Sequence, residues 1–306
     1  MASGIPTNRT NIDLPNSVSS EILQKTQQAS AVMQLARQIT LPGNGVQIPV
    51  ITGDPEADWV TETGVKPVSN PSLSKKIMQA HKLAVIVPFS NEFRRDAAAL
   101  YNALIQRLPN ALGKQFDKTV FFGPGSTLAN FDDFSQVTAQ ALDAYGKTAY
   151  DGLVAADTDI SEQGGIVNGY ALSPQGRGVL LAAVDADKRP LFIDSIADGG
   201  IPRILGAPVY VNGAAYKAGA AGVGTAAGTP DIVGFAGDWA HAMYGTVEGV
   251  KIDFAEQATI TIQEGTSISQ VNLWQRNMFA VRAEIEVGFV AETQYFNALT
   301  RAHAAS

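Results

Sequence analysis

The stretch Phe279-Ala-Val-Arg-Ala-Glu-Ile-Glu-Val-Gly-Phe289 has the most regular hydrophobic pattern in the chain. Every second residue from Phe279 to Phe289 is apolar, and Arg282, Glu284 and Glu286 stand between them. Successive side chains of a β-strand point to opposite faces of a sheet, so this alternation predicts a strand with one buried face. About eleven residues at roughly 3.3 Å each give about 36 Å, which is long for a strand. We expect residues 259–262 to be its partner.

Residues 91–122 predict an element of comparable length. Large apolar residues recur there every three or four positions, as they do along one face of an α-helix. They are Phe93, Ala97, Leu100, Tyr101, Leu104, Leu108, Leu112, Phe116 and Val120. About 30 residues at 1.5 Å each span roughly 45 Å. We expect Pro109 to bend this helix and the Gly-Pro-Gly of residues 123–125 to end it.

The N-terminal residues predict an arm over residues 1–45. Residues 1–16 are small and polar, with prolines at Pro6 and Pro15, and cannot bury enough apolar surface to fold alone. Residues 17–39 carry apolar residues at helical spacing, and residues 41–45 should end that helix.

Residues 46–89 predict an extended hairpin with a long tip, in which residues 83–87 form the return strand and Trp59 lies near the outgoing end. The outgoing half is acidic and the return half is basic. Its acidic residues are Asp54, Glu56, Asp58 and Glu62, and its basic residues are Lys66, Lys75, Lys76 and Lys82. Such a division can select a neighbour electrostatically, although solvated faces and pairs within the hairpin would give the same pattern.

Residues 126–244 predict a second α+β lobe. It includes a helix near residues 173–186 and an apolar strand at residues 207–211, and it makes the fold class α+β. Residues 212–230 are rich in glycine and alanine and predict a mobile loop.

Composition excludes several classes of function. The chain has 306 residues, of which 45% are hydrophobic and only 17% charged, and its net charge is −7. The negative charge argues against a surface that grips nucleic acid throughout. The absence of cysteine removes disulfides, thiolate metal sites and cysteine nucleophiles. The N-terminus lacks a signal-peptide pattern, and no apolar run is long enough for a membrane span.

Two glycine-containing stretches resemble nucleotide-binding motifs only weakly. Residues 141–148 end in Gly146-Lys147-Thr148, but the residues before them look too polar for a buried strand, and Gly152 should interrupt the helix that a phosphate loop requires. Residues 222–227 imitate a dinucleotide fingerprint without a preceding strand. A nucleotide-dependent enzyme centred on Lys147 is therefore a remote alternative.

No arrangement of side chains predicts catalysis or metal binding. His81, His241 and His303 lie far apart in sequence and have no paired ligand spacing. Acidic groups such as Asp132-Asp133 and Asp157 with Asp159 are expected in solvated loops. We expect no enzyme activity, no cofactor and no metal.

The order of these elements, together with several short stretches, resembles the major capsid proteins of tailed phages, which have the Hong Kong 97 fold. The stretches are residues 57–62, 82–92 with Arg95-Asp96, 121–123, 200–209, 237–239, and 275–277 leading to 282–284. The resemblance covers roughly residues 20–300. It implies an N-terminal arm, an extended hairpin (the E-loop) over residues 46–89, and a spine helix. It also implies a peripheral domain over residues 90–125 and 245–290, and an axial domain over residues 126–244 and 291–306.

The resemblance implies self-assembly of pentamers and hexamers into an icosahedral shell around double-stranded DNA. The implied partners are other copies, a separate scaffolding protein, a portal, decoration proteins, and DNA held by weak non-specific contacts; no membrane is involved. The implied location is the virion, with assembly in the host cytoplasm. Contacts between subunits are expected at Trp59, at Arg94 and Arg95, and at seven charged residues of the hairpin. These seven are Asp54, Glu56, Asp58, Glu62, Lys66, Lys75 and Lys76.

Some family members crosslink a hairpin lysine to an asparagine with help from a glutamate. The matching positions here are Asn277 and Glu284, with Lys66 or Lys75 as the amine; simple packing and pairing is the other interpretation of these residues. The nearest alternative function is an encapsulin-like nanocompartment shell, which shares the fold and encloses enzymes.

Overall fold

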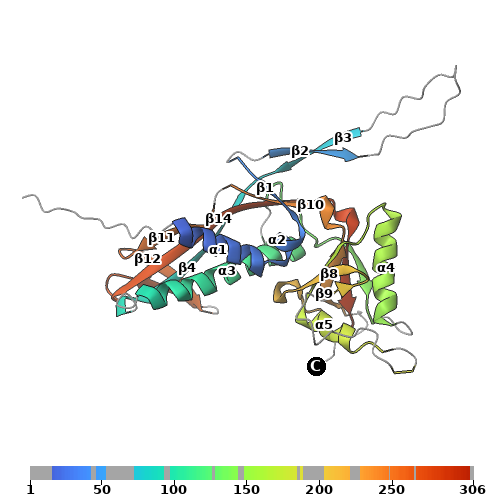
Figure 1. Ribbon diagram of the computed structural model, residues 1–306. Coiled ribbons are helices and arrows are strands. Elements are labelled where there is room, and N and C mark those ends of the chain that lie inside the picture. The colour runs from blue at the N-terminus through green and yellow to red at the C-terminus, as the bar shows by residue number, and fades with distance from the viewer. Residues whose placement is uncertain are drawn as a thin grey trace, which may run out of the picture. The chain divides into compact units, whose positions relative to one another are not determined.

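The computed structural model describes residues 16–42, 46–52, 72–92, 97–125, 128–143, 148–184, 187–188, 203–220, 228–247, 249–264 and 267–303. The chain divides into two compact units. Unit 1 comprises Met1–Gln34, Lys82–Phe116 and Glu248–Glu286, and unit 2 comprises Leu35–His81, Asp117–Val247 and Val287–Ser306. Each unit contains helices and strands, so the α+β class is confirmed (Figure 1).

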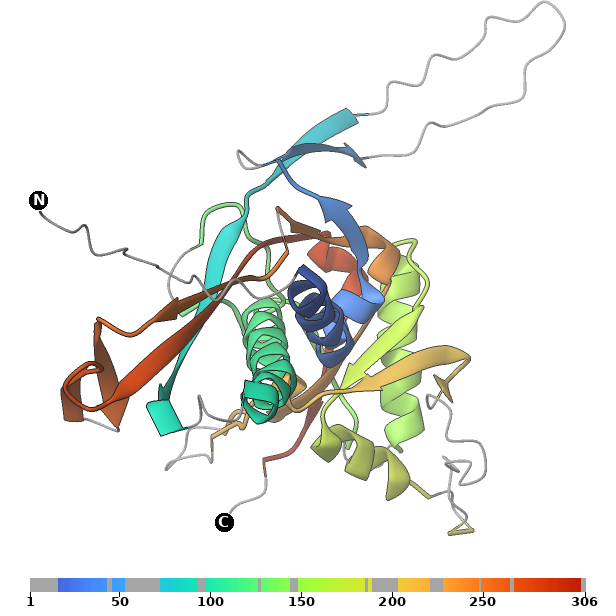
Figure 2. The same ribbon diagram turned by 60° about the vertical axis from the view of Figure 1, so that its left-hand side comes forward.

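Unit 1 combines two helices with antiparallel strands. Helix α1 (Asn16–Ala29) lies beside the part of α3 (Ala97–Phe122) that belongs to this unit (Figure 2). A Cβ atom on Gly113 would come within 3.1 Å of the Thr26 carbonyl oxygen, so glycine permits this close approach. Among the strands, β4 (His81–Ser90) and β11 (Lys251–Ala255) pair with β14 (Met278–Ala291). Strands β12 (Thr259–Glu264) and β13 (Ser267–Asn272) pair with each other.

The hydrophobic core of unit 1 follows directly from the two predicted periodicities. Leu108 and Leu112 of α3 contribute to the same core as alternate residues of β14, and both sets are buried. The residues from β14 are Phe279, Val281, Ala283 and Ile285. The predicted strand 279–289 is therefore confirmed within β14, and the helix continues through Pro109 to Phe122, where Gly123 with φ 79° follows.

Unit 2 is built around a six-stranded mixed sheet of order β5-β15-β9-β6-β8-β7. Its strands are β5 (Thr138–Ala141), β6 (Gly169–Leu172), β7 (Arg203–Ile204), β8 (Ala207–Val211), β9 (Asp231–Gly237) and β15 (Phe296–Arg301). Helices α4 (Ala149–Glu162) and α5 (Pro174–Leu181) supply buried residues to the core of this sheet. The predicted strand 207–211 is confirmed, as is a helix within residues 173–186.

Aromatic rings fill a second part of unit 2. Phe134 lies at the centre of this group, with its ring stacked on Phe296 at 4.4 Å between centroids. Its other ring contacts are Phe121, Phe235, Trp239 and Phe289. All six of these rings are at most 2% exposed, and aromatic rings bury a large area per side chain.

The remaining strands of unit 2 lie in the sheet that contains β14 and in a separate two-stranded sheet. Strand β1 (Arg37–Thr40) pairs in parallel with β10 (Ala242–Thr246), which pairs with Val287–Ala291 of β14. Strands β2 (Val46–Thr52) and β3 (Ser72–Met78) form a separate two-stranded sheet. Among the described residues, no helix is long and apolar enough to cross a membrane.

Three predictions about elements are wrong. The helix expected over residues 17–39 is interrupted at Ser30, continues as α2 (Ala31–Leu35), and gives way to β1, because pairing with β10 overrides the local pattern. Residues 83–87 belong to β4, which pairs with β14, and the return strand of the hairpin is β3. Residues 259–262 pair with β13 rather than β14.

One expectation about loops is also wrong. Asp157 and Asp159 lie in α4, not in a loop, and Asp159 accepts a hydrogen bond from Asn297.

The mobility of the loop expected over residues 212–230 stays a prediction. Its described parts contain a short turn at Gly213–Ala215 and two isolated bridges, Lys217 with Ile232 and Ala220 with Thr229. Residues 221–227 lie outside the described residues.

Candidate functional site

The hairpin formed by β2 and β3 is the candidate contact element that the charge pattern predicts. Seven residues on each strand pair in antiparallel register, from Val46 with Met78 to Thr52 with Ser72. Most of the predicted contact residues lie outside the described residues: Asp54, Glu56, Asp58, Trp59, Glu62, Lys66, Arg94 and Arg95. Lys75 lies in β3, and its side chain is also outside the description. Lys76 is the predicted contact residue that the structure describes fully.

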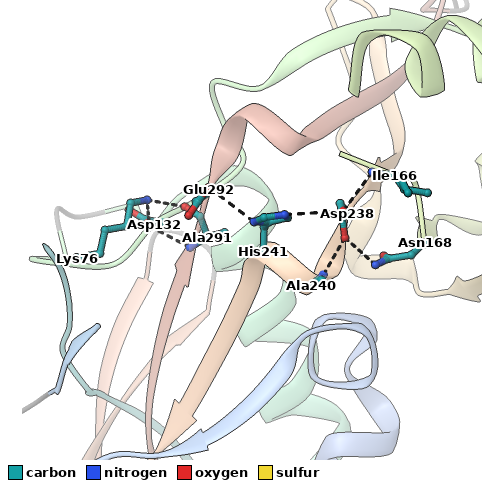
Figure 3. Close-up of polar contacts among 9 residues, drawn as sticks. All are labelled: Lys76, Asp132, Ile166, Asn168, Asp238, Ala240, His241, Ala291 and Glu292. Atoms are coloured by element: carbon teal, nitrogen blue, oxygen red, sulfur yellow. Dashed lines mark hydrogen bonds and ion pairs between the residues drawn. The ribbon is translucent and has the colours of Figure 1, made fainter. Parts of the chain in front are cut away.

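Lys76 attaches the root of the hairpin to the rest of unit 2. Its ammonium group donates to the Asp132 carboxylate at 2.9 Å and to the Ala291 carbonyl oxygen at 2.6 Å. The same Asp132 oxygen accepts from the Ala291 backbone N–H at 3.0 Å (Figure 3). Three segments far apart in sequence thus meet at one charged, hydrogen-bonded cluster, which we call the root cluster: Lys76, Asp132 and Ala291. Asp132 was expected to be merely solvated, and that expectation is wrong.

Close apolar packing supports the root cluster. Met78, the last residue of β3, is fully buried and packs with Leu41 and Val290. A Cβ atom on Gly288 would lie 2.7 Å from the Gln79 carbonyl oxygen, so β14 can approach the hairpin root only because residue 288 is glycine. The root is consequently fixed by both backbone packing and one ion pair.

A second polar network begins at the next residue, Glu292. The His241 ring lies between two carboxylates, 3.7 Å from Glu292 and 3.9 Å from Asp238 (Figure 3). It also stacks on Tyr295 at 4.1 Å. Asp238 in turn accepts hydrogen bonds from the Ile166 N–H, the Asn168 amide and the Ala240 N–H. This network fixes the η3 turn (Trp239–His241), and we assign it a structural role.

Asp231 is the most strongly engaged carboxylate in unit 2. It is almost completely buried, which by itself would raise the pKa of its carboxyl group. Hydrogen bonds from His303, the Gly219 N–H, Arg301 and Tyr216 outweigh burial and hold the pKa well below its ordinary value. Asp231 thereby ties the loop after β8 and the end of β15 to β9. The sequence offered no signal for it, because its donors come from distant segments.

The two residues matched to the crosslink lie apart within one chain. Asn277 precedes β14, has φ 53°, and accepts a hydrogen bond from the Asn91 amide at 2.8 Å. Glu284 lies seven positions along the same extended strand, roughly 23 Å away at about 3.3 Å per residue, and pairs with Arg282 at 3.2 Å. Glu284 therefore cannot assist Asn277 within one subunit.

The residues around the phosphate-loop motif, 141–148, do not have the local structure that the sequence predicted. Strand β5 precedes it and α4 follows it, and Gly152 does not interrupt α4. Instead, a Cβ atom on Gly152 would lie 2.5 Å from the Ala141 carbonyl oxygen, so the glycine serves close packing. The Thr148 side chain caps α4, and the Asp151 carboxylate accepts from the Thr148 N–H at 2.7 Å. A carboxylate therefore occupies the helix start that a phosphate would need. Lys147 lies outside the described residues.

Comparison with known proteins identifies the class of this α+β chain. A sequence model described as the phage capsid family matches residues 12–299. The chain is 27% identical over 285 residues to the probable major capsid protein gp17 of Mycobacterium phage D29, covering 90% of this chain and 86% of that protein. It is 22% identical over 298 residues to the major capsid protein of Staphylococcus phage 80alpha, covering 94% and 85%.

A solved structure gives the same result at the level of the fold. A chain from Microbacterium phage Oxtober96 is 25% identical and has a TM-score of 0.65, with 89% of this chain and 91% of that chain covered. The capsid of an empty GTA particle shares the fold, with a TM-score of 0.62 at 16% identity. The family match spans almost the whole sequence, and the chain belongs to the phage capsid family.

Proposed function

We propose that this chain is the major capsid protein of a tailed phage and that many copies assemble into the closed shell around the genome. The observation that carries the proposal is the family match over residues 12–299, joined by relatives that are themselves named major capsid proteins. The relatives named above come from phages, which favours a genome over the enzyme cargo of an encapsulin-like shell. The role is mechanical rather than enzymatic.

Electron microscopy of the expressed full chain tests this function directly. We expect closed shells of uniform size, from the chain alone or after co-expression with a scaffolding protein of the same phage. Sedimentation should place most of the protein in one fast species. A chain that stays monomeric at every concentration and with every phage partner would contradict the proposal.

The parts of the Hong Kong 97 fold follow as finer proposals. The hairpin of β2 and β3, residues 46–78, is the E-loop that reaches a neighbouring copy, because β4 pairs with β14 instead. Helix α3 is the spine helix, and the peripheral and axial domains have the bounds predicted from the sequence. Support comes from β2 and β3, which pair with each other in a separate sheet and are fastened at one end by the root cluster. A hairpin of two strands is at best marginally stable alone, so a neighbour has to contribute to its burial.

The charged residues of the hairpin are the proposed contacts between copies. The acidic set is Asp54, Glu56, Asp58 and Glu62, and the basic set is Lys66 and Lys75, joined by Arg94 and Arg95. Lys76 was also predicted as a contact but is left out, because its ammonium group pairs with Asp132 of its own chain. Contacts between such sets weaken in salt. Reversing the acidic charges should prevent assembly, and reversing both sets should restore it; a double reversal that stays unassembled would contradict this pairing.

An isopeptide crosslink has a simple test. The amine of Lys66 or Lys75 would attack the Asn277 carboxamide carbon, forming an amide bond and releasing ammonia. Because Glu284 is distant from Asn277 in one chain, the assisting carboxylate would have to come from another copy. Covalent oligomers on a denaturing gel of mature shells, lost in Asn277→Ala, would support the crosslink, and fully monomeric bands would exclude it.

The remaining partners are proposed from the same family membership. They are a scaffolding protein, a portal, decoration proteins and packaged double-stranded DNA, with assembly in the host cytoplasm. Because the net charge is −7, contacts with DNA would be few and non-specific. Mass spectrometry of purified virions from the phage would identify these partners.

A further inference from the structure

The turn between β7 and β8 has a backbone conformation that other residue types adopt more readily than its residue Leu205. Arg203 pairs with Pro208 and Ile204 with Ala207, which leaves Leu205 and Gly206 as a two-residue hairpin loop. Both have positive φ angles, 49° and 85°. Two positive φ values mark a type I′ turn, in which asparagine or aspartate followed by glycine is strongly preferred.

Gly206 meets this preference and Leu205 does not. A side chain on an L-residue in the left-handed region comes too close to its own backbone, and leucine has no polar atom that could form a compensating local hydrogen bond. A bulky apolar residue with positive φ is therefore a strained exception. The other described residues with positive φ are polar or glycine: Asn130, Lys188, Asn277, Gly123 and Gly164.

The side chain of Leu205 does not belong to the hydrophobic cluster of the sheet in unit 2. It is 49% exposed, whereas Ile204 and Ala207 on either side of the loop are 6% exposed and belong to the hydrophobic cluster of the sheet. An asparagine at this position would relieve the strain and suit the solvent. Leu205 thus violates two local preferences at once: a bulky apolar residue has a positive φ angle, and its side chain is half-exposed.

The position of the turn explains how a second molecule could use it. Strand β7 is only two residues long and forms the last strand of the six-stranded sheet, so the turn lies at a sheet edge. Two other elements that contribute to the same cluster, α5 and β8, also carry exposed apolar residues, Leu181 and Val211, which are 45% and 43% exposed. A hydrocarbon side chain favours an apolar protein surface over DNA phosphates.

We infer that Leu205 is an apolar contact between copies of this chain, and that the strained turn holds its side chain outward in a fixed position. Strain that persists at one exposed site commonly reflects such a function. The partner is a second copy, because the match to the phage capsid family makes other copies of this chain the expected occupants of its exposed surfaces. This inference rests on the proposed shell function.

The test compares Leu205→Asn with Leu205→Met in the full chain. Asparagine relieves the strain and removes the apolar side chain, whereas methionine keeps a side chain of similar size and apolarity and retains the strain. We expect Leu205→Asn to raise the concentration needed for half-assembly by about tenfold or more, because leucine burial is lost at each contact. Dissociated Leu205→Asn subunits should nevertheless melt about 2 °C higher than wild type. Leu205→Met should assemble within about twofold of wild type.

Leu205→Asn is expected to weaken assembly and to raise the melting temperature of the subunit. These opposite effects distinguish the loss of a contact from a folding defect. Leu205→Asn that assembles at the wild-type concentration would overturn the inference while leaving the proposed function intact. Poor assembly joined to a lower melting temperature would also overturn it, since the strain argument would be wrong. A wild type that never assembles would instead count against the proposed function.

Discussion

The six-stranded sheet and the β2–β3 hairpin of unit 2 are stabilised in contrasting ways. The sheet carries two helices, a cluster of aromatic rings and a buried carboxylate with four donor groups. The hairpin pairs only within itself among the described residues and is fixed at its root by Lys76 and Met78. A region with its own interior can fold before assembly, whereas the hairpin depends on what surrounds it.

This contrast predicts that substitutions in the sheet will act on folding and substitutions at the hairpin root on assembly. The experiments below measure both quantities for each variant. The sheet variants should change the free energy of unfolding of dissociated subunits. The variant at the hairpin root, Lys76→Met, should change this free energy of unfolding little.

The largest effect is expected at Phe134. Phe134→Ala removes a ring that is 2% exposed and contacts five other aromatic rings, which should lower the free energy of unfolding by about 3–5 kcal/mol. Urea denaturation of dissociated subunits measures this value. Ile166→Ala is the control, because Ile166 is 73% exposed and should contribute within about 0.5 kcal/mol. A loss below about 1 kcal/mol for Phe134→Ala would show that the cluster does not hold the sheet together.

The second effect is expected at Asp231. Asp231→Asn leaves Arg301 and His303 without their carboxylate, which should cost about 2–3 kcal/mol at neutral pH. Asp253→Asn is the matched control, since its pair with Arg282 is exposed to solvent and should contribute little to the free energy of unfolding.

The pH dependence of Asp231 has a defined sign. The pKa of the folded carboxyl group is lowered, so its stabilisation is complete above its ordinary value of about 3.9 and is lost as the pH falls below that. The stability difference between wild type and Asp231→Asn should therefore shrink progressively below about pH 4. A difference that stays constant from pH 6 to pH 3 would mean that the charge of Asp231 contributes nothing.

The smallest effect on folding is expected at the hairpin root. Lys76→Met removes the ammonium donor from Asp132 and Ala291, at a cost of about 1 kcal/mol, and should accelerate amide hydrogen exchange in β2 and β3. Lys82→Met removes a more exposed pair with Glu286 and should leave exchange unchanged. If Lys76→Met assembled as well as Lys82→Met, fixation of the root would be irrelevant to the shell.

Periodicity predicted the long elements well. The stripe through Leu108, Leu112 and Phe116 and the alternation along β14 are both strong signals, because each reports one buried face. They located the core of unit 1 without any knowledge of its partners. The pairing of β14 could not be predicted in the same way, since several strands carry comparable patterns.

Elements that depend on tertiary contacts escaped prediction. Helix α4 was missed because Gly152 resembles a helix breaker, although it is required for close packing against Ala141. Strand β1 has only four residues and exists through its pairing with β10. The root cluster and the Asp231 cluster each join distant segments, so no local pattern could indicate them.

Pro109 gives α3 a mechanical property that its length alone would not. Because proline has no amide hydrogen, the hydrogen bond from residue 109 to the carbonyl of Ile105 cannot form, although the helix continues on both sides. Bending at this place costs less than bending where that bond is present. A container with both pentamers and hexamers requires identical chains to adopt unequal curvature. Helix α3 can change its curvature by bending at Pro109, so that the side chains toward its two ends keep their packing contacts.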